Sequence, residues 1–368
     1  MSTGAAQPLC LLAAGLAGAG GFSGPAAVLV DRGRVRALGQ EALQAGAPRR
    51  ELAGLWLSPA PLDAHVHLHL GGTPAANLAA SRAAGLAAVR DLGHQPRLET
   101  PRGENQQPPL VQAAGPGLGA QGPGGSWLAQ GLRGPQAFAQ AVATRAQARA
   151  GVIKLFASGL LDFARPGQVL HPLTLGREEM RAAVAEAGRA GLRVTAHASG
   201  EQAVRAALAC GVQGVEHGFF LGRETLQEMA ARGVSWSPTL AAVQAHIRDT
   251  EGRYDQAQRG RLQEIARRQA AQIRLGAALG VRLVLGSDAG SYGLPHGQAA
   301  FLEMAAWLQV GVAPELVFRA ATSRPARALG LESELGGIFP GARAWLLACH
   351  GDPRQDPLHL TRPAWRSF

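Results

Sequence analysis

The sequence predicts an α/β fold, a (β/α)8 barrel with a small β-sandwich domain built from the N- and C-terminal segments. Three observations lead to this prediction. Short apolar runs rich in β-branched residues alternate with Ala-rich amphipathic stretches from about residue 60 onward. Glycine ends most of the amphipathic stretches, as a left-handed helix C-cap would. The repeats cover about 275 residues, close to the roughly 250 of a typical (β/α)8 barrel.

The eight predicted strands follow one another along the chain. They are expected at residues 62–68, 86–92, 109–115, 151–158, 192–199, 214–220, 234–240 and 282–290. The helical stretches between them are expected to end at Gly85, Gly151, Gly191, Gly211, Gly233 and Gly280. The Gly-rich stretch 115–127 is predicted to be a long loop beside the active site. A doubly wound open sheet is the alternative fold, but its first strand would end in a glycine-rich turn and not in histidines.

The chain divides into two predicted domains. The barrel is expected to span residues 59–334, and residues 1–58 together with 335–368 are expected to form the sandwich. The first segment contains short strands and turns without helix–strand alternation, as in AAVLVDRGRVRALG.

Composition excludes several classes of protein. Apolar residues make up 46% and charged residues 17% of the chain, which is typical of a globular protein. No run of about 18 apolar residues predicts a membrane span, and no basic residue precedes the apolar run near the N-terminus as in a signal peptide. The cysteines, Cys10, Cys210 and Cys349, are odd in number and far apart, which indicates a reducing compartment. We therefore expect a cytoplasmic protein with no membrane partner.

The net charge of +10 is spread along the chain. Arginines occur in nearly every helix-like segment, with only short pairs such as Arg267-Arg268, so solvated helix faces are expected and nucleic acid is not. Of the 36 basic residues, Lys154 is the single lysine. In a chain this rich in arginine, a lysine at one position needs a chemical explanation. Lysine, unlike arginine, provides an amine that can lose its proton.

Histidines mark the end of the first predicted strand. Alternate residues of a strand share a face, so His65 and His67 in DAHVHL point the same way and can bind a metal. Two such histidines could also serve only as hydrogen-bonding groups. Further metal-binding residue types lie in later predicted strands, where barrel enzymes gather their catalytic groups. These are Lys154, His197, His217 and Asp288.

The motifs LDAHVHL, VRDLG, IKLFASG, TAHASGEQA, GVEHG, PTL, GSDAG and LGGIFPG occur in this order. Together they resemble the amidohydrolase superfamily, and most closely its imidazolonepropionase-related and Xaa-Pro dipeptidase-like (prolidase-like) branch. The resemblance implies that His65, His67 and Asp288 hold one zinc ion and that His197 and His217 hold a second. It further implies that Lys154, carboxylated by CO2, bridges the two ions and that Asp288 transfers the proton. One departure from the family pattern is Leu160, which stands where a second glycine usually follows the lysine strand.

Charge supports a carbamate at Lys154. An ammonium group beside two dications would be repelled in a low-dielectric site, whereas a carbamate contributes a negative charge and two oxygen ligands. Arginine stays protonated and cannot replace it. A barrel lysine held in a salt bridge is the alternative interpretation. Two ions about 3.5 to 4 Å apart would lower the pKa of a shared water, so that a bridging hydroxide attacks the carbonyl.

The predicted function is hydrolysis of an amide or peptide-like C–N bond in a small molecule, such as an Xaa-Pro dipeptide or an N-acyl amino acid. The first alternative is a one-metal deaminase or imidazolone-type cyclic amide hydrolase, which usually employs a catalytic glutamate. Glu216 is next to His217, but strand alternation predicts that it faces away from the metal. A non-catalytic basic binding protein is the more remote alternative. The sequence is also compatible with a homo-oligomer.

Several residues of the predicted barrel-top loops are candidates for substrate binding, through contacts to a carboxylate or a ring. Arg90 and Asp91 are expected to pair with each other at the barrel mouth. The loop candidates are Trp127, Arg165, His171, Tyr292 and His296.

Overall fold

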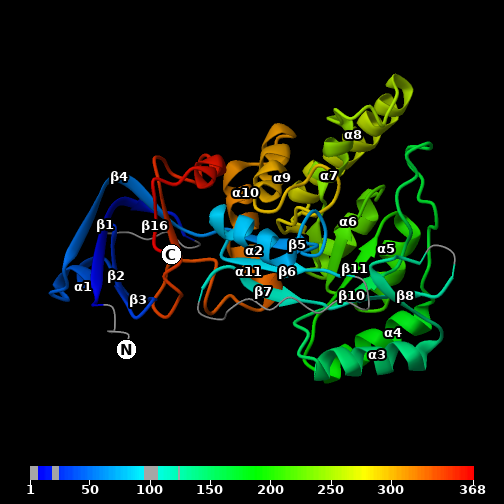
Figure 1. Ribbon diagram of the computed structural model, residues 1–368, viewed down its shortest axis with the longest axis horizontal. Helices are drawn as coiled ribbons and strands as arrows, with labels where there is room; N and C mark the ends of the chain where they lie inside the picture. The colour runs from blue at the N-terminus through cyan, green and yellow to red at the C-terminus, as the bar shows by residue number, and fades with distance from the viewer. Residues whose placement is uncertain (1–6, 19–24, 95–106, 123–124) are drawn as a thin grey trace.

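The computed structural model describes residues 7–18, 25–94, 107–122 and 125–368. Figure 1 shows a sheet of the terminal segments at one end of the long axis and a larger body of strands surrounded by helices at the other. No helix among the described residues is long and apolar enough to cross a membrane.

The terminal segments form one six-stranded sheet in the order β16-β15-β4-β1-β2-β3. The parallel pair β1/β4 lies in its middle, and the other neighbours are antiparallel. A second layer, as in a sandwich, and the predicted domain boundaries stay predictions. The strands are β1 (Leu9–Leu16), β2 (Ala27–Asp31), β3 (Arg34–Leu38), β4 (Arg49–Pro59), β15 (Leu346–Cys349) and β16 (Trp365–Arg366).

The larger body is a TIM-barrel-type α/β fold. Its strands form two parallel sheets, β5-β6-β7 and β14-β13-β12-β11-β10-β8-β9, and all eight predicted strands are present. These strands are β5 (Leu62–Val66), β6 (Ala88–Asp91), β7 (Leu110–Ala113), β8 (Gly117–Ala120), β9 (Ala129–Leu132), β10 (Ile153–Phe156), β11 (Val194–Ala198), β12 (Gly214–His217), β13 (Ser235–Ser237) and β14 (Arg282–Leu283).

Backbone hydrogen bonds link the two sheets at both junctions. The N–H of Ala64 in β5 donates to the carbonyl of Leu285, just after β14, at 2.8 Å. On the other side, the N–H of Gly151 donates to the carbonyl of Ala113 in β7 at 2.9 Å. These contacts bring the first and last strands of the predicted barrel next to each other, although complete closure stays a prediction.

The prediction that residues 115–127 form a loop is wrong at residues 117–120, which form β8 of the sheet. Leu118 and Gly119 of β8 pair with β10. A Cβ atom at Gly117 would lie 2.4 Å from a ring carbon of Phe156. Glycine therefore serves close strand packing here, whereas a pattern of glycines in sequence suggests turns.

The helices cover the strands as the alternation predicts. The predicted glycine C-caps are confirmed at five of the six positions, with positive φ at Gly85, Gly191, Gly211, Gly233 and Gly280. The sixth was wrong: after α3 the left-handed residue is Arg149 (φ 61°), and Gly151 instead makes room for Gln112. The helices are α1 (Gly39–Gln44), α2 (Pro74–Ala83), α3 (Pro135–Gln147), α4 (Arg177–Arg189), α5 (Glu201–Ala209), α6 (Arg223–Ala231), α7 (Leu240–Ile247), α8 (Gln256–Ala278), α9 (Gln298–Gln309), α10 (Pro314–Ala321), α11 (Ser323–Leu329) and the 3-10 helix η1 (Pro357–Thr361).

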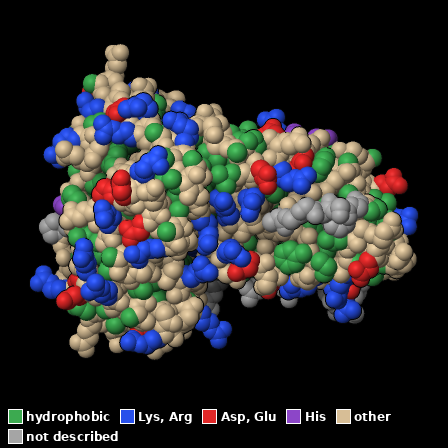
Figure 2. All heavy atoms as spheres, turned by 180° about the vertical axis from the view of Figure 1, so that it is seen from behind, with side chains coloured by type: hydrophobic (Ala, Val, Ile, Leu, Met, Phe, Trp, Pro, Cys, Tyr) green, Lys and Arg blue, Asp and Glu red, His purple; other side chains and the backbone are tan. Residues whose placement is uncertain are grey.

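Basic side chains occur in many places on the face drawn in Figure 2. They lie among acidic and apolar side chains, and they are arginines, because the single lysine is buried. On α8, Arg267 and Arg268 both pair with Glu264, each at 2.7 Å. These pairs agree with the expectation that arginines occupy solvated helix faces.

Candidate metal centre

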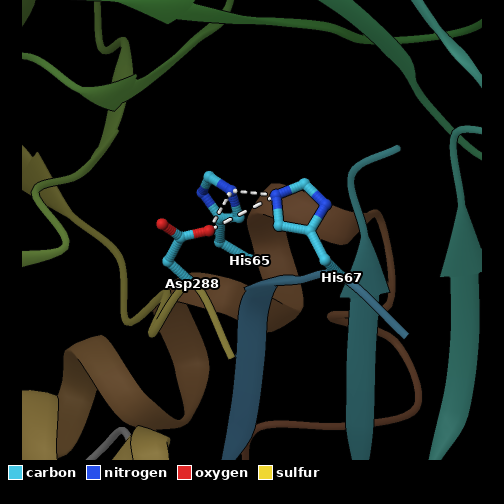
Figure 3. A group of neighbouring side chains, drawn as sticks. All are labelled: His65, His67 and Asp288. Carbon is cyan, nitrogen blue, oxygen red and sulfur yellow. Dashed lines mark hydrogen bonds and ion pairs between the residues drawn. The ribbon is translucent and has the colours of Figure 1, made fainter. Parts of the chain in front are cut away.

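The two histidines of β5 and Asp288 converge on one point inside the fold. The Nε2 atoms of His65 and His67 lie 3.3 Å apart, and each lies 3.3 to 3.4 Å from the Oδ1 atom of Asp288. Figure 3 shows the two imidazoles and the carboxylate pointing toward one another. All three ligand atoms lie within 4.8 Å of one another, which is compatible with a shared metal ion.

The position of Asp288 depends on a local change of backbone direction. Its φ angle of 60° is left-handed, and its N–H donates to the carbonyl of His65 at 2.8 Å. Burial opposes ionisation of the carboxyl, but His65 and His67 nevertheless hold the pKa of Asp288 well below its usual range. Asp288 is therefore an anion, as a metal ligand must be.

His197 and His217 lie beside this group. Their ring centroids are 4.5 Å apart, and the ring of His217 is 5.1 Å from that of His65. One nitrogen of each ring is in contact with an oxygen: Nε2 of His197 with the carbonyl of Gly159 at 3.2 Å, and Nδ1 of His217 with the hydroxyl of Thr239 at 2.8 Å. Burial lowers the pKa of His197 to about 3 and that of His217 well below its usual value. Both imidazoles are thus neutral and able to bind a cation.

Lys154 is buried in the same region. Its side chain is 1% exposed, and no hydrogen-bond partner for its Nζ atom exists among the described residues. No carboxylate of the described chain lies within ion-pair distance, so the salt-bridge interpretation finds no support there. Burial lowers the pKa of Lys154 to about 8. The Nζ atom lies 5.4 Å from the centre of the Phe156 ring, but a buried amine without a hydrogen-bond partner is costly unless another group occupies the space around it.

Glu216 is where the sequence prediction was wrong. Its carboxylate does not face away but is fully buried under the histidines, with Oε2 2.8 Å from Nδ1 of His65. Oε1 accepts hydrogen bonds from Arg90 at 2.9 Å and from the hydroxyl of Thr195. The reason is the backbone of His217, whose left-handed φ of 69° ends the strand alternation at this residue. The side chains of Glu216 and His217 therefore both point inward, at different heights.

Arg90 also differs from the prediction. Its guanidinium is buried and donates to Glu216 and to the carbonyl of Ala64 at 2.7 Å, and it does not pair with the adjacent Asp91. Neighbouring residues of β6 point to opposite sides, which prevents a direct pair. Arg90 lies in the motif VRDLG and Glu216 in GVEHG, but sequence spacing alone does not indicate that the two side chains meet.

Two cavities open beside the histidines. The first has a volume of about 520 Å³ and the second about 320 Å³, and both are bounded by His197, His217 and Asp288. Lys154 and His67 line the second cavity. The converging side chains are therefore reachable by a small molecule.

The five loop candidates separate into two groups. Trp127 and His171 line the second cavity. The other three do not line either cavity and have other partners: Arg165 pairs with Asp162 at 2.6 Å, Tyr292 donates its hydroxyl to Asp249, and Nε2 of His296 is 3.2 Å from the carbonyl of Leu70.

Residues 56–366 match the Amidohydrolase family. The chain belongs to this family. As an amidohydrolase it is a hydrolase that acts on carbon–nitrogen bonds. An uncharacterised protein of Mycobacterium tuberculosis is 29% identical over 319 residues, covering 84% of this chain and 83% of its own length.

Solved structures also resemble this amidohydrolase. A putative prolidase from Bifidobacterium longum has a TM-score of 0.81 and 24% identity, over 98% of this chain and 93% of that one. A Xaa-Pro dipeptidase with methionine bound in its active site has a TM-score of 0.78 and 21% identity, over 97% of both chains. At these identities the likeness establishes the shared fold.

Sequence reasoning missed part of this amidohydrolase centre. Thr195, Thr239 and Arg90 hold the inward-facing side chains in place but carry no recognisable ligand pattern. Thr239 has a left-handed backbone (φ 48°), and that conformation is visible only in the structure.

Proposed function

We propose that this chain is a divalent-metal-dependent hydrolase of amide or peptide-like C–N bonds, with an Xaa-Pro dipeptide or an N-acyl amino acid as substrate. The observation that carries the proposal is the buried amine of Lys154, which has no hydrogen-bond partner among the described residues and lies beside four histidines and an aspartate. The names of the prolidase and Xaa-Pro dipeptidase structures support this substrate class.

The residues fit two zinc-like ions. His65, His67 and Asp288 would hold one ion, and His197 and His217 the other. Lys154 would hold both after its neutral amine has added CO2 and released a proton, which forms a carbamate with two oxygen ligands. This assignment accounts for the unpartnered Nζ atom, and it explains why the single lysine of the chain occurs here. When bound, the ions supply Lewis acidity to the substrate carbonyl and increase the acidity of water.

The protein residues have separate tasks in this reaction. Glu216 and Thr239 orient His65 and His217 through their Nδ1 atoms, which leaves each Nε2 free to bind. Asp288 accepts the proton of the attacking water and donates it to the leaving nitrogen as the C–N bond breaks. The products are a carboxylic acid and an amine.

A one-metal deaminase or cyclic amide hydrolase is the second candidate. The observation in its favour is that, among the described residues, His65, His67 and Asp288 are the only group of three that converges this tightly, with the carboxylate of Glu216 next to His65. Glu216 is, however, already engaged by Arg90, Thr195 and His65, so it is better suited to orient a ligand than to carry protons.

Metal and CO2 content tests the proposal. We expect up to two zinc-like ions per chain, together with cleavage of at least one Xaa-Pro dipeptide or N-acyl amino acid in a substrate panel. Protein prepared under carbon-13-labelled CO2 should show a side-chain carbamate signal. A single ion, no carbamate and release of ammonia from ring substrates would favour the second candidate instead.

A further inference from the structure

A short hairpin follows the lysine strand and covers part of the site. Its backbone is held by hydrogen bonds from Gly159 to His171 at 2.8 Å and from Leu170 to Leu160 at 2.9 Å. Asp162 closes the turn, with its N–H bonded to the carbonyl of Gln168 at 3.1 Å. The hairpin thus holds Leu160 and Leu170 opposite each other, next to an isolated antiparallel bridge between Leu161 and Val169.

These two leucines expose unusually large apolar surfaces. Leu160 is 67% and Leu170 51% exposed, and the only comparable large apolar residue in the described part of the chain is Trp127 at 57%. All three line the cavities beside the histidines, and the two leucines line both cavities. Exposed apolar side chains gathered at one site mark a binding surface.

The first cavity has an apolar wall formed by other elements. Phe219 and Val243 are almost fully buried and belong to a packed cluster with Leu262 and Ile265 of α8, and Phe163 packs against this cluster. This wall is therefore fixed by the core of the fold.

The described residues that line the first cavity include no arginine or lysine; of its two carboxylates, Asp162 is paired with Arg165 and Asp288 belongs to the candidate metal centre. An anionic substituent placed among the apolar side chains would lose its hydration without gaining a cationic side-chain partner from this lining. An uncharged apolar group would instead cover the leucines and the wall.

Resting on the proposed function, we propose that the substrate carries a large uncharged apolar group next to the scissile C–N bond. An aromatic ring or a branched aliphatic chain of this kind binds in the first cavity, between Leu160 and Leu170 on one side and Phe163, Phe219 and Val243 on the other. The cavity is continuous with the reacting centre, because His197, His217 and Asp288 also bound it.

Three acyl-prolines test this assignment on the metal-loaded protein. They carry acetyl, 3-phenylpropionyl or succinyl groups, so that size and charge vary at one position. We expect kcat/KM for 3-phenylpropionyl-proline to exceed that for acetyl-proline by about tenfold or more, and succinyl-proline to be the poorest. Equal values for the three, or a preference for the succinyl compound, would overturn the proposal.

Substitution of the exposed leucines tests the site itself. Leu160→Asn and Leu170→Asn should each lower the ratio of 3-phenylpropionyl to acetyl activity by about fivefold, since each removes apolar surface from the cavity. Because both side chains are mostly exposed, the variants should fold. Leu43→Asn, at a partly buried leucine of helix α1 that lines neither cavity, is the control and should leave the ratio unchanged.

Calorimetric binding of 3-phenylpropionate and succinate separates this proposal from the proposed function. If neither these acyl-prolines nor any other member of the dipeptide and N-acyl amino acid panel is cleaved, the proposed amide hydrolysis fails on its own. Tighter binding of 3-phenylpropionate, with a negative heat-capacity change and about fivefold weakening in Leu160→Asn, would still support the apolar site. Binding that is equal for the two acids, or unaffected by the leucine variants, would overturn it.

Discussion

The Nδ1 atom of His65 lies 2.8 Å from the Oε2 atom of Glu216, and this contact joins β5 to β12 underneath the candidate metal centre. Both side chains are fully buried. Because the carboxylate accepts the Nδ1–H, the lone pair of His65 is left on Nε2, which faces His67 and Asp288. Arg90 holds the other carboxylate oxygen, so the orientation of the ligand is set by a chain of buried charges.

Glu216→Gln is expected to weaken metal binding by about 10- to 100-fold, because a neutral amide no longer fixes the His65 tautomer. Metal affinity measured by competition with a chelator would check this. Glu332→Gln, at an exposed glutamate, is the matched control and should bind metal like the wild type. An unchanged affinity in Glu216→Gln would contradict the positioning role.

Lys154→Arg is expected to lose the second metal ion and most of the activity, since a guanidinium cannot form a carbamate. The labelled-CO2 signal should also disappear, which is readily assigned because the chain contains a single lysine. Metal analysis and carbon-13 spectroscopy provide the two readouts. Retention of both ions and full activity in this variant would refute the binuclear assignment.

Removal of metal by a chelator is expected to abolish activity and to lower Tm. An ion that binds only the native state at 100 times its Kd stabilises it by about 2.7 kcal/mol. Differential scanning calorimetry before and after chelation checks the stability, and added zinc should restore both properties. If the chelated protein keeps its Tm and its activity, metal dependence is wrong.

Glu303 of α9 predicts a pH dependence of stability. Its buried carboxyl accepts N–H groups of Leu240, Ala241 and Trp307, yet burial raises its pKa from 4.5 to about 7. The native state therefore binds more protons than the unfolded state between these values. Its contribution to the free energy of unfolding should fall as the pH rises through this range and stay level above about 7.

Comparison with Glu303→Gln isolates this contribution, because glutamine does not titrate. Denaturant unfolding at several pH values should show the wild type losing on the order of 2 kcal/mol relative to the variant between about pH 4.5 and 7. A difference between the two proteins that does not vary with pH would count against the raised pKa.

Gly117→Ala is expected to destabilise the protein by about 1 to 3 kcal/mol, because the new Cβ would collide with the ring of Phe156. That ring stacks on His197 with centroids 5.5 Å apart, so metal binding should weaken as well. Gly188→Ala is the matched control: it lies within α4 with open space around it, and alanine should stabilise that helix by up to about 1 kcal/mol. Equal effects of both substitutions on Tm would contradict this packing argument.

Much of the fold could be predicted from local pattern. Apolar runs with glycine-ended helices located all eight predicted strands, because strand and helix periods are properties of a few consecutive residues. The glycines of β8 were misinterpreted as turn residues, because the sequence does not distinguish a glycine that permits close packing with Phe156 from one that permits a turn. Only the neighbouring strand distinguishes the two.

The sequence by itself determined which residue types stand at the carboxyl ends of the strands, including His65, His67 and the single lysine. The tertiary structure decided how they meet. The left-handed backbones of His217 and Asp288 turn their side chains inward and let Glu216 reach His65, and the hairpin brings Leu160 to both cavities. Strand alternation predicts the direction of a side chain only where the strand is regular. Packing between distant segments determines where the strand becomes irregular.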